Sequence, residues 1–200
     1  MGGDAALDFV NTAEERGHPE AGEALVSPAD LRLWGQRYGL LGSSARLGAD
    51  AGAELDRARR ARDLLYAVFA ALIDGRPATR AQLAGLAGLG RAAYQAGSLQ
   101  AADDHSVRWH WNRSDLATVR HVAVTSGVEL LRAVPSPRLK QCPGDHCGWM
   151  FLDATKRGNR RWCLMSECGQ DAKDVRRRAR RHAAGTGPDE PAAARRSASF

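Results

Sequence analysis

The 200-residue sequence contains no hydrophobic run long enough to cross a bilayer. Its longest apolar run, Leu64 to Ile73, has ten residues between two aspartates, about half of what a membrane-spanning helix needs. The opening residues, Met1 to Asp8, carry acidic groups and no basic region of the kind that begins a signal peptide. We therefore expect a protein without a membrane segment that resides in the cytoplasm.

The sequence also lacks the usual signatures of an enzyme. It has no glycine-rich phosphate loop, no nucleophile elbow and no arrangement that suggests a catalytic triad. His105, His110 and His121 lie in one region, but no second histidine at helical spacing and no carboxylate pair accompanies them. We expect neither catalysis nor a metal site there.

Cysteine is scarce, and its placement is informative. Four cysteines occur, all within 27 positions, with the spacing Cys-x4-Cys-x15-Cys-x4-Cys: Cys142, Cys147, Cys163 and Cys168. In a reducing cytosol such a cluster indicates metal binding rather than disulfides. Zinc takes four thiolates at tetrahedral corners, and four protein ligands leave no open position, so we predict one structural Zn²⁺.

Other interpretations of the cysteines remain open. Two disulfides or an iron–sulfur cluster would also use four thiols, whereas a redox pair is disfavoured because no Cys-x2-Cys occurs. His146 could replace one cysteine as a ligand, but as the neighbour of Cys147 it would need an awkward backbone. We expect it to be exposed.

Residues 1–134 are predicted to form a mainly helical domain, α+β only through a small hairpin. Ser27-Pro28-Ala29-Asp30 has the features of a helix start, Glu54 to Ile73 carries a clear apolar stripe, and Thr79 to Ala93 is a weaker helix. Leu99 to Asn112 alternates as a half-buried strand does, and a turn precedes the alternation. A further helix follows Ser114-Asp115.

A small zinc module is predicted over residues 138–184, after a Pro135-Ser136-Pro137 linker. Gly148 to Leu152 suits a strand and Lys156 to Asn159 a loop or hairpin turn between the two cysteine pairs. The module is expected to be treble-clef or ribbon-like and to end in a basic helix. It is too small to bury much apolar surface, so metal binding would supply much of its folding free energy. Residues 185–200 are expected to be disordered.

Positive charge is concentrated in this module. The formal net charge is +6, and from Cys142 to Ala183 there are ten Lys or Arg against five Asp or Glu. Asp171 to Ala183 favours a helix whose alanines and Val175 would pack on the zinc core and whose other side is basic. The candidate nucleic-acid contacts on this helix are Lys173, Arg176, Arg177, Arg180 and Arg181. A second basic group on the loop between the cysteine pairs comprises Lys156, Arg157, Arg160 and Arg161.

Such a surface attracts phosphate backbones, although a charge run is often only a solvated face. We expect double-stranded DNA as the partner. A protein-interaction adaptor that docks on an acidic partner, such as polymerase or a sigma factor, is the alternative. RNA is a third possibility, and the lack of an aromatic stacking platform near the basic helix counts against it. The sequence carries no signal for oligomeric state.

Cys142 to Arg181 resembles the CGNR zinc-finger family of bacterial proteins. The resemblance rests on the cysteine pairs, Gly148-Trp149 with Phe151-Leu152-Asp153, Asn159 to Cys163, and Met165 to Gly169 leading into Ala172-Lys173. Leu7-Asp8-Phe9-Val10-Asn11-Thr12 is similar to the opening of the ABATE domain that precedes this finger. The resemblance implies a transcription regulator, with a DNA-binding finger and a domain that senses stress or a small-molecule effector.

Two positions, Gln170 and Asp171, depart from this pattern. The motif that names the family reads Cys168-Gly169-Gln170-Asp171 here, so its Asn and Arg are replaced, which puts affinity or sequence choice in doubt. Asp171 is acceptable at a helix start. Asp8 and Asn11 could line a pocket, but we favour the simpler interpretation that they satisfy local backbone groups.

Overall fold

The computed structural model describes residues 2–13, 22–133 and 135–185. The tail for which disorder is expected lies, except for residue 185, outside the described residues. The first part of the chain is mainly helical, and the second part is a small module with two short strands, four clustered cysteines and one helix, as the sequence predicts. No helix of the described residues is long and apolar enough to cross a membrane.

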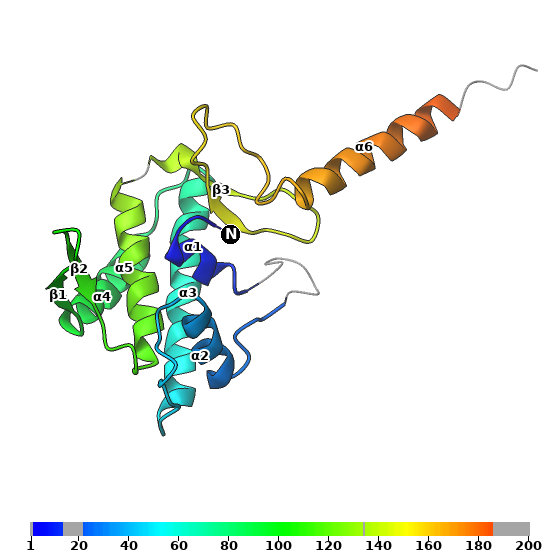
Figure 1. Cartoon of the computed structure of the whole chain (residues 1–200). Helices are drawn as coiled ribbons and strands as arrows, with labels where there is room; N and C mark the ends of the chain where they lie inside the picture. The colour runs from blue at the N-terminus through cyan, green and yellow to red at the C-terminus, as the bar shows by residue number, and fades with distance from the viewer. Residues whose placement is uncertain (1, 14–21, 134, 186–200) are drawn as a thin grey trace, which may run out of the picture.

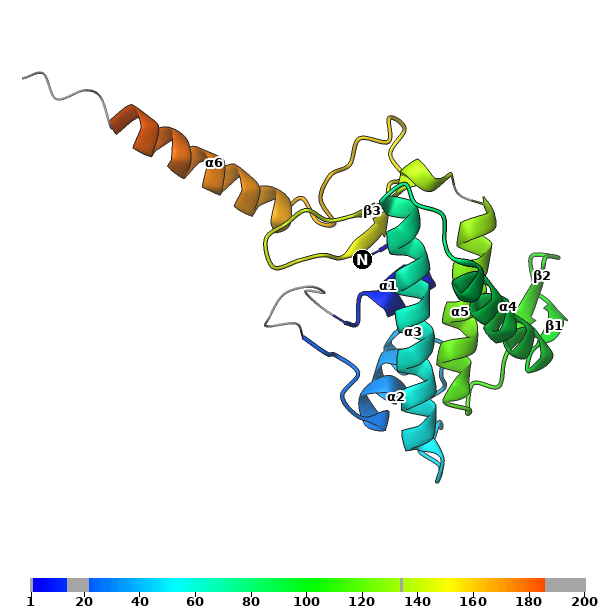
Figure 2. The same cartoon turned by 180° about the vertical axis from the view of Figure 1, so that it is seen from behind.

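Two long helices, α3 (Ala51–Ile73) and α5 (Ala117–Ala133), form the centre of the first part (Figures 1 and 2). They lie side by side, and the short first helix packs across both of them. The fourth helix packs on the side of this pair that lies opposite the first helix, and the second helix lies beside one end of the pair. The helices are α1 (Ala5–Val10), α2 (Pro28–Arg37), α3 (Ala51–Ile73), α4 (Arg80–Gln95) and α5 (Ala117–Ala133).

Local sequence explains where these helices begin and which faces they bury. Ser27 and Thr79 each form a capping box with the third helical residue of α2 and α4. Five residues of the predicted stripe of α3 are at most 5% exposed and form the middle of the core: Leu55, Ala58, Ala61, Leu65 and Val68. The sixth, Leu72, is partly buried against the same core. These helices confirm the sequence prediction.

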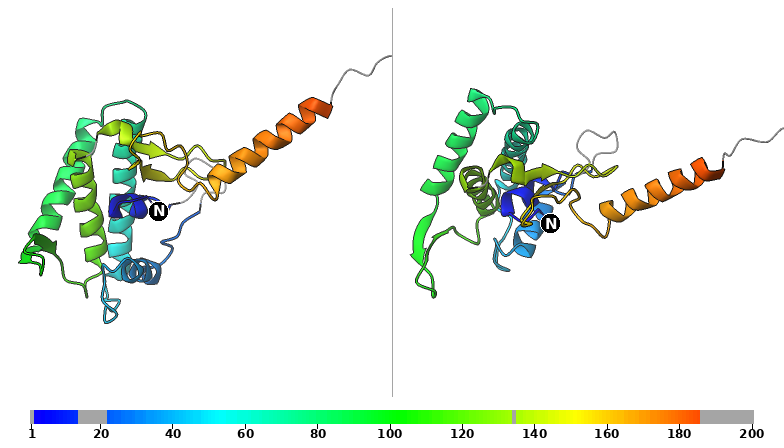
Figure 3. Two further views of the ribbon diagram at one scale, coloured as in Figure 1. Left: turned by 45° about the horizontal axis from the view of Figure 1, so that its top comes forward. Right: turned by 90° about the horizontal axis from the view of Figure 1, so that it is seen from above.

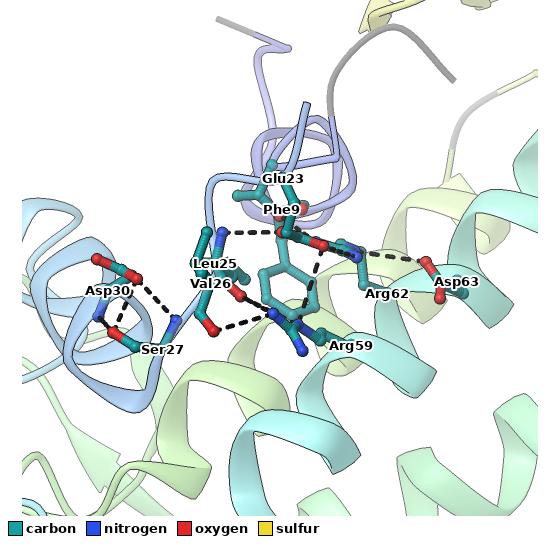
Figure 4. Close-up of polar contacts among 10 residues, drawn as sticks. Phe9, Glu23, Leu25, Val26, Ser27, Asp30, Arg59, Arg62 and Asp63 are labelled. Atoms are coloured by element: carbon teal, nitrogen blue, oxygen red, sulfur yellow. Dashed lines mark hydrogen bonds and ion pairs between the residues drawn. The ribbon is translucent and has the colours of Figure 1, made fainter. Parts of the chain in front are cut away.

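Two arginines of α3 hold the segment that leads into α2 (Figure 4). Arg62 is 4% exposed, and its two terminal nitrogens each donate to one oxygen of Glu23 at 2.7 Å. Arg59 donates to the carbonyl oxygens of Leu25 and Val26. Bidentate pairing of this kind fixes the relative orientation of Arg62 and Glu23 as well as their distance. The segment that leads into α2 therefore lies close to α3.

The predicted hairpin is formed by β1 (Ser98–Ala101) and β2 (Val107–His110), which pair antiparallel. Trp111 follows β2, is buried, and donates from Nε1 to the carbonyl of Ala93 at 2.8 Å. The second tryptophan of the pattern, Trp109, is 39% exposed and lies against Tyr94. Both tryptophans therefore attach the hairpin to α4, but the predicted burial of alternate residues is wrong for β2, whose four residues are all exposed.

A second hairpin, of β3 (Leu139–Gln141) and β4 (Met150–Leu152), lies between the helices and the cysteines. A short 3-10 turn (Ser136–Arg138) leads into it. The predicted strand is present as β4, and residues 156–159 form the predicted loop rather than a hairpin turn, because β4 pairs with β3, which precedes the first cysteine. Alternate residues of a strand face opposite sides. Leu139 and Met150 accordingly belong to the helical core, whereas Phe151 packs among the cysteines.

The last helix, α6 (Cys168–Gly185), projects away from the rest of the protein (Figures 1 and 3). Gly169 is buried against Met165 and Trp162. From Lys173 to Arg181 every side chain except that of Asp174 is exposed. Among the residues that the structure describes up to Arg181, packing therefore supports mainly the first turn of α6.

Candidate metal centre and basic surface

The four cysteines form one compact cluster. Their sulfur atoms all lie within 4.8 Å of one another, with 3.4 Å between Cys147 and Cys163 and 3.6 Å between Cys163 and Cys168. Tetrahedral zinc with bonds of about 2.3 Å separates its sulfurs by about 3.8 Å. All four cysteines are free thiols, so the disulfide alternative is wrong. The cluster fits one zinc ion.

Two tight turns bring the sulfurs together. Cys142 directly follows β3, and its N–H donates to the carbonyl of Trp149 at 2.8 Å. The turn returns through His146 and Gly148, which both have positive φ. Gly144 lies in this turn, where an added Cβ would meet the Cys168 sulfur at 3.0 Å, so a larger residue would press on a ligand. His146 is exposed and does not belong to the cluster.

The electrostatics of the cluster favour a cation. Burial raises the pKa of Cys168 to about 12, and the neighbouring Cys147 sulfur adds to the rise. Burial and the same crowding also raise the pKa of Cys163. Burial acts to raise the pKa of Cys142, but N–H groups of Cys163 and Gly144 donate to its sulfur and bring that pKa below the usual value. Four adjacent thiolates are compatible only with a bound cation.

A small apolar core surrounds the cysteines. Cys142, Phe151 and Cys163 are buried, and the rings of Trp149 and Trp162 pack against them. This core is separate from the large core of the helices. With so little apolar surface of its own, the module depends on its ligand set for stability. Zinc bound here would be structural, because the four sulfurs fill its coordination sphere.

Asp153 organises the loop between the cysteine pairs. It is 1% exposed and accepts hydrogen bonds from Lys140 Nζ at 2.7 Å, the Arg160 N–H at 2.8 Å, and both the N–H and hydroxyl of Thr155. Burial acts to raise its pKa, but Lys140 and Thr155 hold that pKa well below the usual range. Lys140 Nζ also donates to the carbonyls of Gly158 and Arg160. The loop is therefore tied down at both ends.

The predicted basic residues of this loop take two orientations. Lys156, Arg157 and Arg161 are exposed. Arg160 is half-buried: its guanidinium lies 4.6 Å from the centre of the Phe151 ring and donates to the carbonyls of Trp162 and Cys163. Arg160 thus has a structural task within the module.

The five candidate basic residues of α6 lie together. They line one shallow hollow on the helix surface: Lys173, Arg176, Arg177, Arg180 and Arg181. The expectation that the opposite side packs on the zinc core is wrong. Val175 is 62% exposed and Ala179 is exposed too, because α6 leaves the module after its first turn. Asp171 lies in that first turn, and Gln170 Nε2 is 3.4 Å from the Asp174 carboxylate.

Sequence reasoning missed the role of Asn11. Its side-chain Nδ2 donates to the carbonyl of Met150 at 2.9 Å, and the Met150 N–H donates to its Oδ1 at 2.8 Å. The favoured interpretation, satisfaction of local backbone groups, is therefore wrong for Asn11. For Asp8, which accepts from the N–H of Gly2 at 2.6 Å, it is correct. Among the described residues no histidine joins a metal-binding cluster.

Comparison with known families supports this organisation. Residues 3–134 match ABATE, described as "Putative stress-induced transcription regulator", and residues 138–181 match zf-CGNR, described as "CGNR zinc finger". The search of curated proteins found no match. The resemblances inferred from sequence are confirmed. The chain therefore belongs to the ABATE family and carries a CGNR zinc finger after the ABATE domain.

Proposed function

We propose that the protein is a sensor that binds double-stranded DNA through its zinc module. In this proposal residues 1–134 form the sensing domain, and the four cysteines hold one zinc ion that fixes the start of α6. The single observation that carries it is the basic hollow on α6, a helix that projects from the module and whose side chains from Lys173 to Arg181 are exposed except that of Asp174. An exposed helix of this kind has the dimensions to enter a major groove.

Phosphate contacts are assigned to the outward-facing basic residues. The α6 residues would approach the groove, while Lys156, Arg157 and Arg161 on the loop would neutralise neighbouring phosphates. Arg160 is left out of this set, because its guanidinium is occupied by Phe151 and by backbone carbonyls. The Asp153 network supports the loop position, since it fixes the backbone on both sides of Lys156 and Arg157.

The test is a charge reversal on α6. Arg176→Glu together with Arg177→Glu should abolish duplex binding in gel-shift titrations, with bound zinc unchanged. Arg80→Glu together with Arg91→Glu is the matched control, because both arginines are exposed on α4 and the net charge changes equally. Equal binding by the α6 variant and the wild type at the same salt concentration would show that the assigned surface is wrong.

The adaptor alternative has one observation in its favour. Val175 is 62% exposed on the same bare helix, and an apolar residue among arginines also suits a groove on an acidic protein. Gel shifts at two salt concentrations separate the alternatives. DNA binding predicts a retarded duplex near 50 mM salt and a steep loss of affinity as salt rises. Absence of duplex binding at low salt would favour the adaptor, and competition by single-stranded RNA over duplex would favour RNA.

A further inference from the structure

A small hollow lies where α1, α2 and the zinc module meet. Its volume is about 250 Å³. Asp8 of α1, three residues of α2 and its C-terminal end (Trp34, Arg37 and Tyr38) and Trp149, directly before β4, contribute to its lining. The hollow is smaller than the roughly 300–1,000 Å³ of sites for drug-sized ligands, so it suits a molecule about the size of an amino acid.

Two opposite charges border this hollow without pairing with each other. Asp8 is half-buried and accepts one hydrogen bond from the Gly2 N–H, and burial raises its pKa. Arg37 is exposed in the last turn of α2. Among the residues that the structure describes, neither side chain forms an ion pair with a protein group. A half-buried carboxylate without an ion-pair partner is stabilised when a cation binds beside it.

Aromatic rings line the hollow together with the two charges. Trp34 and Tyr38 stack with their centroids 4.2 Å apart and their planes at 21°. Trp149 of the zinc module contributes a third ring to the lining. The faces of tryptophan and tyrosine attract ammonium groups, N-methylated ones included. The surroundings of Asp8 therefore offer both a counter-charge and ring faces to one cationic group.

We propose that this hollow binds a small zwitterion, with its ammonium group beside Asp8 and the aromatic rings and its carboxylate paired with Arg37. The assignment uses both charged groups of the lining, one carboxylate and one guanidinium, together with its aromatic rings. An organic cation alone would leave Arg37 without a partner and close to a like charge. A simple anion would lie against the carboxylate of Asp8.

The hollow also lies directly beside the connection to the metal module. Asn11, which bonds to Met150, belongs to its lining, and the carbonyl of Trp149 accepts the N–H of Cys142. A ligand here would contact both parts of the protein at once. The consequence that such a ligand changes DNA affinity rests on the proposed function, whereas ligand binding itself does not.

The experiment is calorimetric titration of the full-length, zinc-loaded protein with glycine betaine and with β-alanine, each a probe of the zwitterion class. At least one should bind saturably and roughly tenfold or more tightly than tetramethylammonium or acetate, which carry one charge each. Asp8→Asn, which keeps an acceptor for Gly2, and Arg37→Gln should each weaken binding roughly tenfold. Asp103→Asn and Arg91→Gln are exposed controls and should leave it unchanged.

The proposal is overturned if neither zwitterion binds saturably, if a singly charged ion binds equally well, or if Asp8→Asn retains full affinity with zinc content intact. Gel shifts without ligand are run in parallel. Zwitterion binding by a protein that does not bind DNA would refute the proposed function alone. Normal DNA binding without zwitterion binding would refute the present inference alone.

Discussion

Asn11 and Met150 are joined by two hydrogen bonds, at 2.9 and 2.8 Å, although 139 positions separate them in the sequence. The side-chain amide of Asn11 thus takes the place of a neighbouring strand for β4. Gly2 extends this edge, since its carbonyl accepts the N–H of Leu152 at 2.9 Å. An added Cβ at Gly2 would lie 2.6 Å from the Leu7 Cβ and 3.1 Å from the Met150 oxygen, so the close approach needs glycine. The beginning of the chain therefore holds the zinc module in place.

Replacing this amide should loosen the junction. Asn11→Ala leaves the buried N–H and C=O of Met150 without partners, which costs about 1–3 kcal/mol in the free energy of unfolding. Chemical denaturation followed by circular dichroism measures that loss. Asn159→Ala, at an exposed loop position, is the control and should change stability little. An Asn11→Ala protein as stable as the wild type would mean that the junction contributes nothing.

The sequence predicts local features well and the junction poorly. Capping boxes at Ser27 and Thr79 and the stripe of α3 are written in neighbouring residues, and so is the spacing of the cysteines. The helix α1 has only six residues, too few for a periodic pattern, and β3 has only three. The pairing of Asn11 with Met150 depends on how distant segments pack, which no local pattern encodes. The exposed course of α6 likewise depends on tertiary packing.

Zinc removal should destabilise the zinc module before the helical part of the protein. Cys163→Ser deletes a buried ligand, so bound zinc should fall from one per chain to near zero, and chelation of the wild type should do the same. Hydrogen exchange should then accelerate between residues 142 and 168 while amides of α3 stay protected. Restored protection after zinc is added back is the control. Unchanged exchange in the metal-free protein would contradict a structural role for the ion.

A buried ion pair makes the helical part acid-sensitive. Glu54 is 5% exposed and pairs with Arg120, at 2.7 Å from Nε; burial acts to raise its pKa, but bonds from Arg120 and Arg57 lower it overall. The stabilisation is therefore complete above the unfolded value of about 4.3 and is lost as the pH falls through the lower folded pKa.

Glu54→Gln tests this pair. At neutral pH it should cost about 3–5 kcal/mol, because Arg120 stays buried without its counter-charge. The difference from the wild type should shrink as the pH drops below about 4. Asp56→Asn, exposed on the same helix, is the control. A difference that does not depend on pH would argue against ionic pairing in the folded state.

Asp153 should matter for DNA binding without touching DNA. Asp153→Asn removes the charge that Lys140 requires and weakens the hold on the loop, so Lys156 and Arg157 no longer keep fixed positions. The slope of log K against log salt should become shallower by about 0.9 for each phosphate that the loop no longer neutralises. Zinc content should stay at one per chain. Asp145→Asn, exposed in the first cysteine turn, is the matched control, and an identical slope for both variants would rule out this positioning role.

The residue that departs from the family motif gives a gain-of-affinity test. Asp171 is exposed in the first turn of α6 and stands where the family motif has its arginine. Asp171→Arg should tighten duplex binding and steepen the salt dependence by about 0.9. It should also cost about 0.3–1 kcal/mol of helix stability, because the acid favours the helix N-terminus. Glu129→Arg on α5 changes the net charge equally and is the control, and weaker binding by Asp171→Arg would contradict the proposed orientation.

The 18 residues of α6 extend for about 27 Å. Because its side chains from Lys173 to Arg181 are exposed except that of Asp174, packing among the described residues sets the direction of α6 at its metal end. A duplex bound along α6 would lie away from the helical domain, and the hollow beside Trp149 would stay open to solvent while DNA is bound. Small changes in the position of the zinc turn would produce larger displacements of the outermost arginines, so the metal site would determine where these arginines lie.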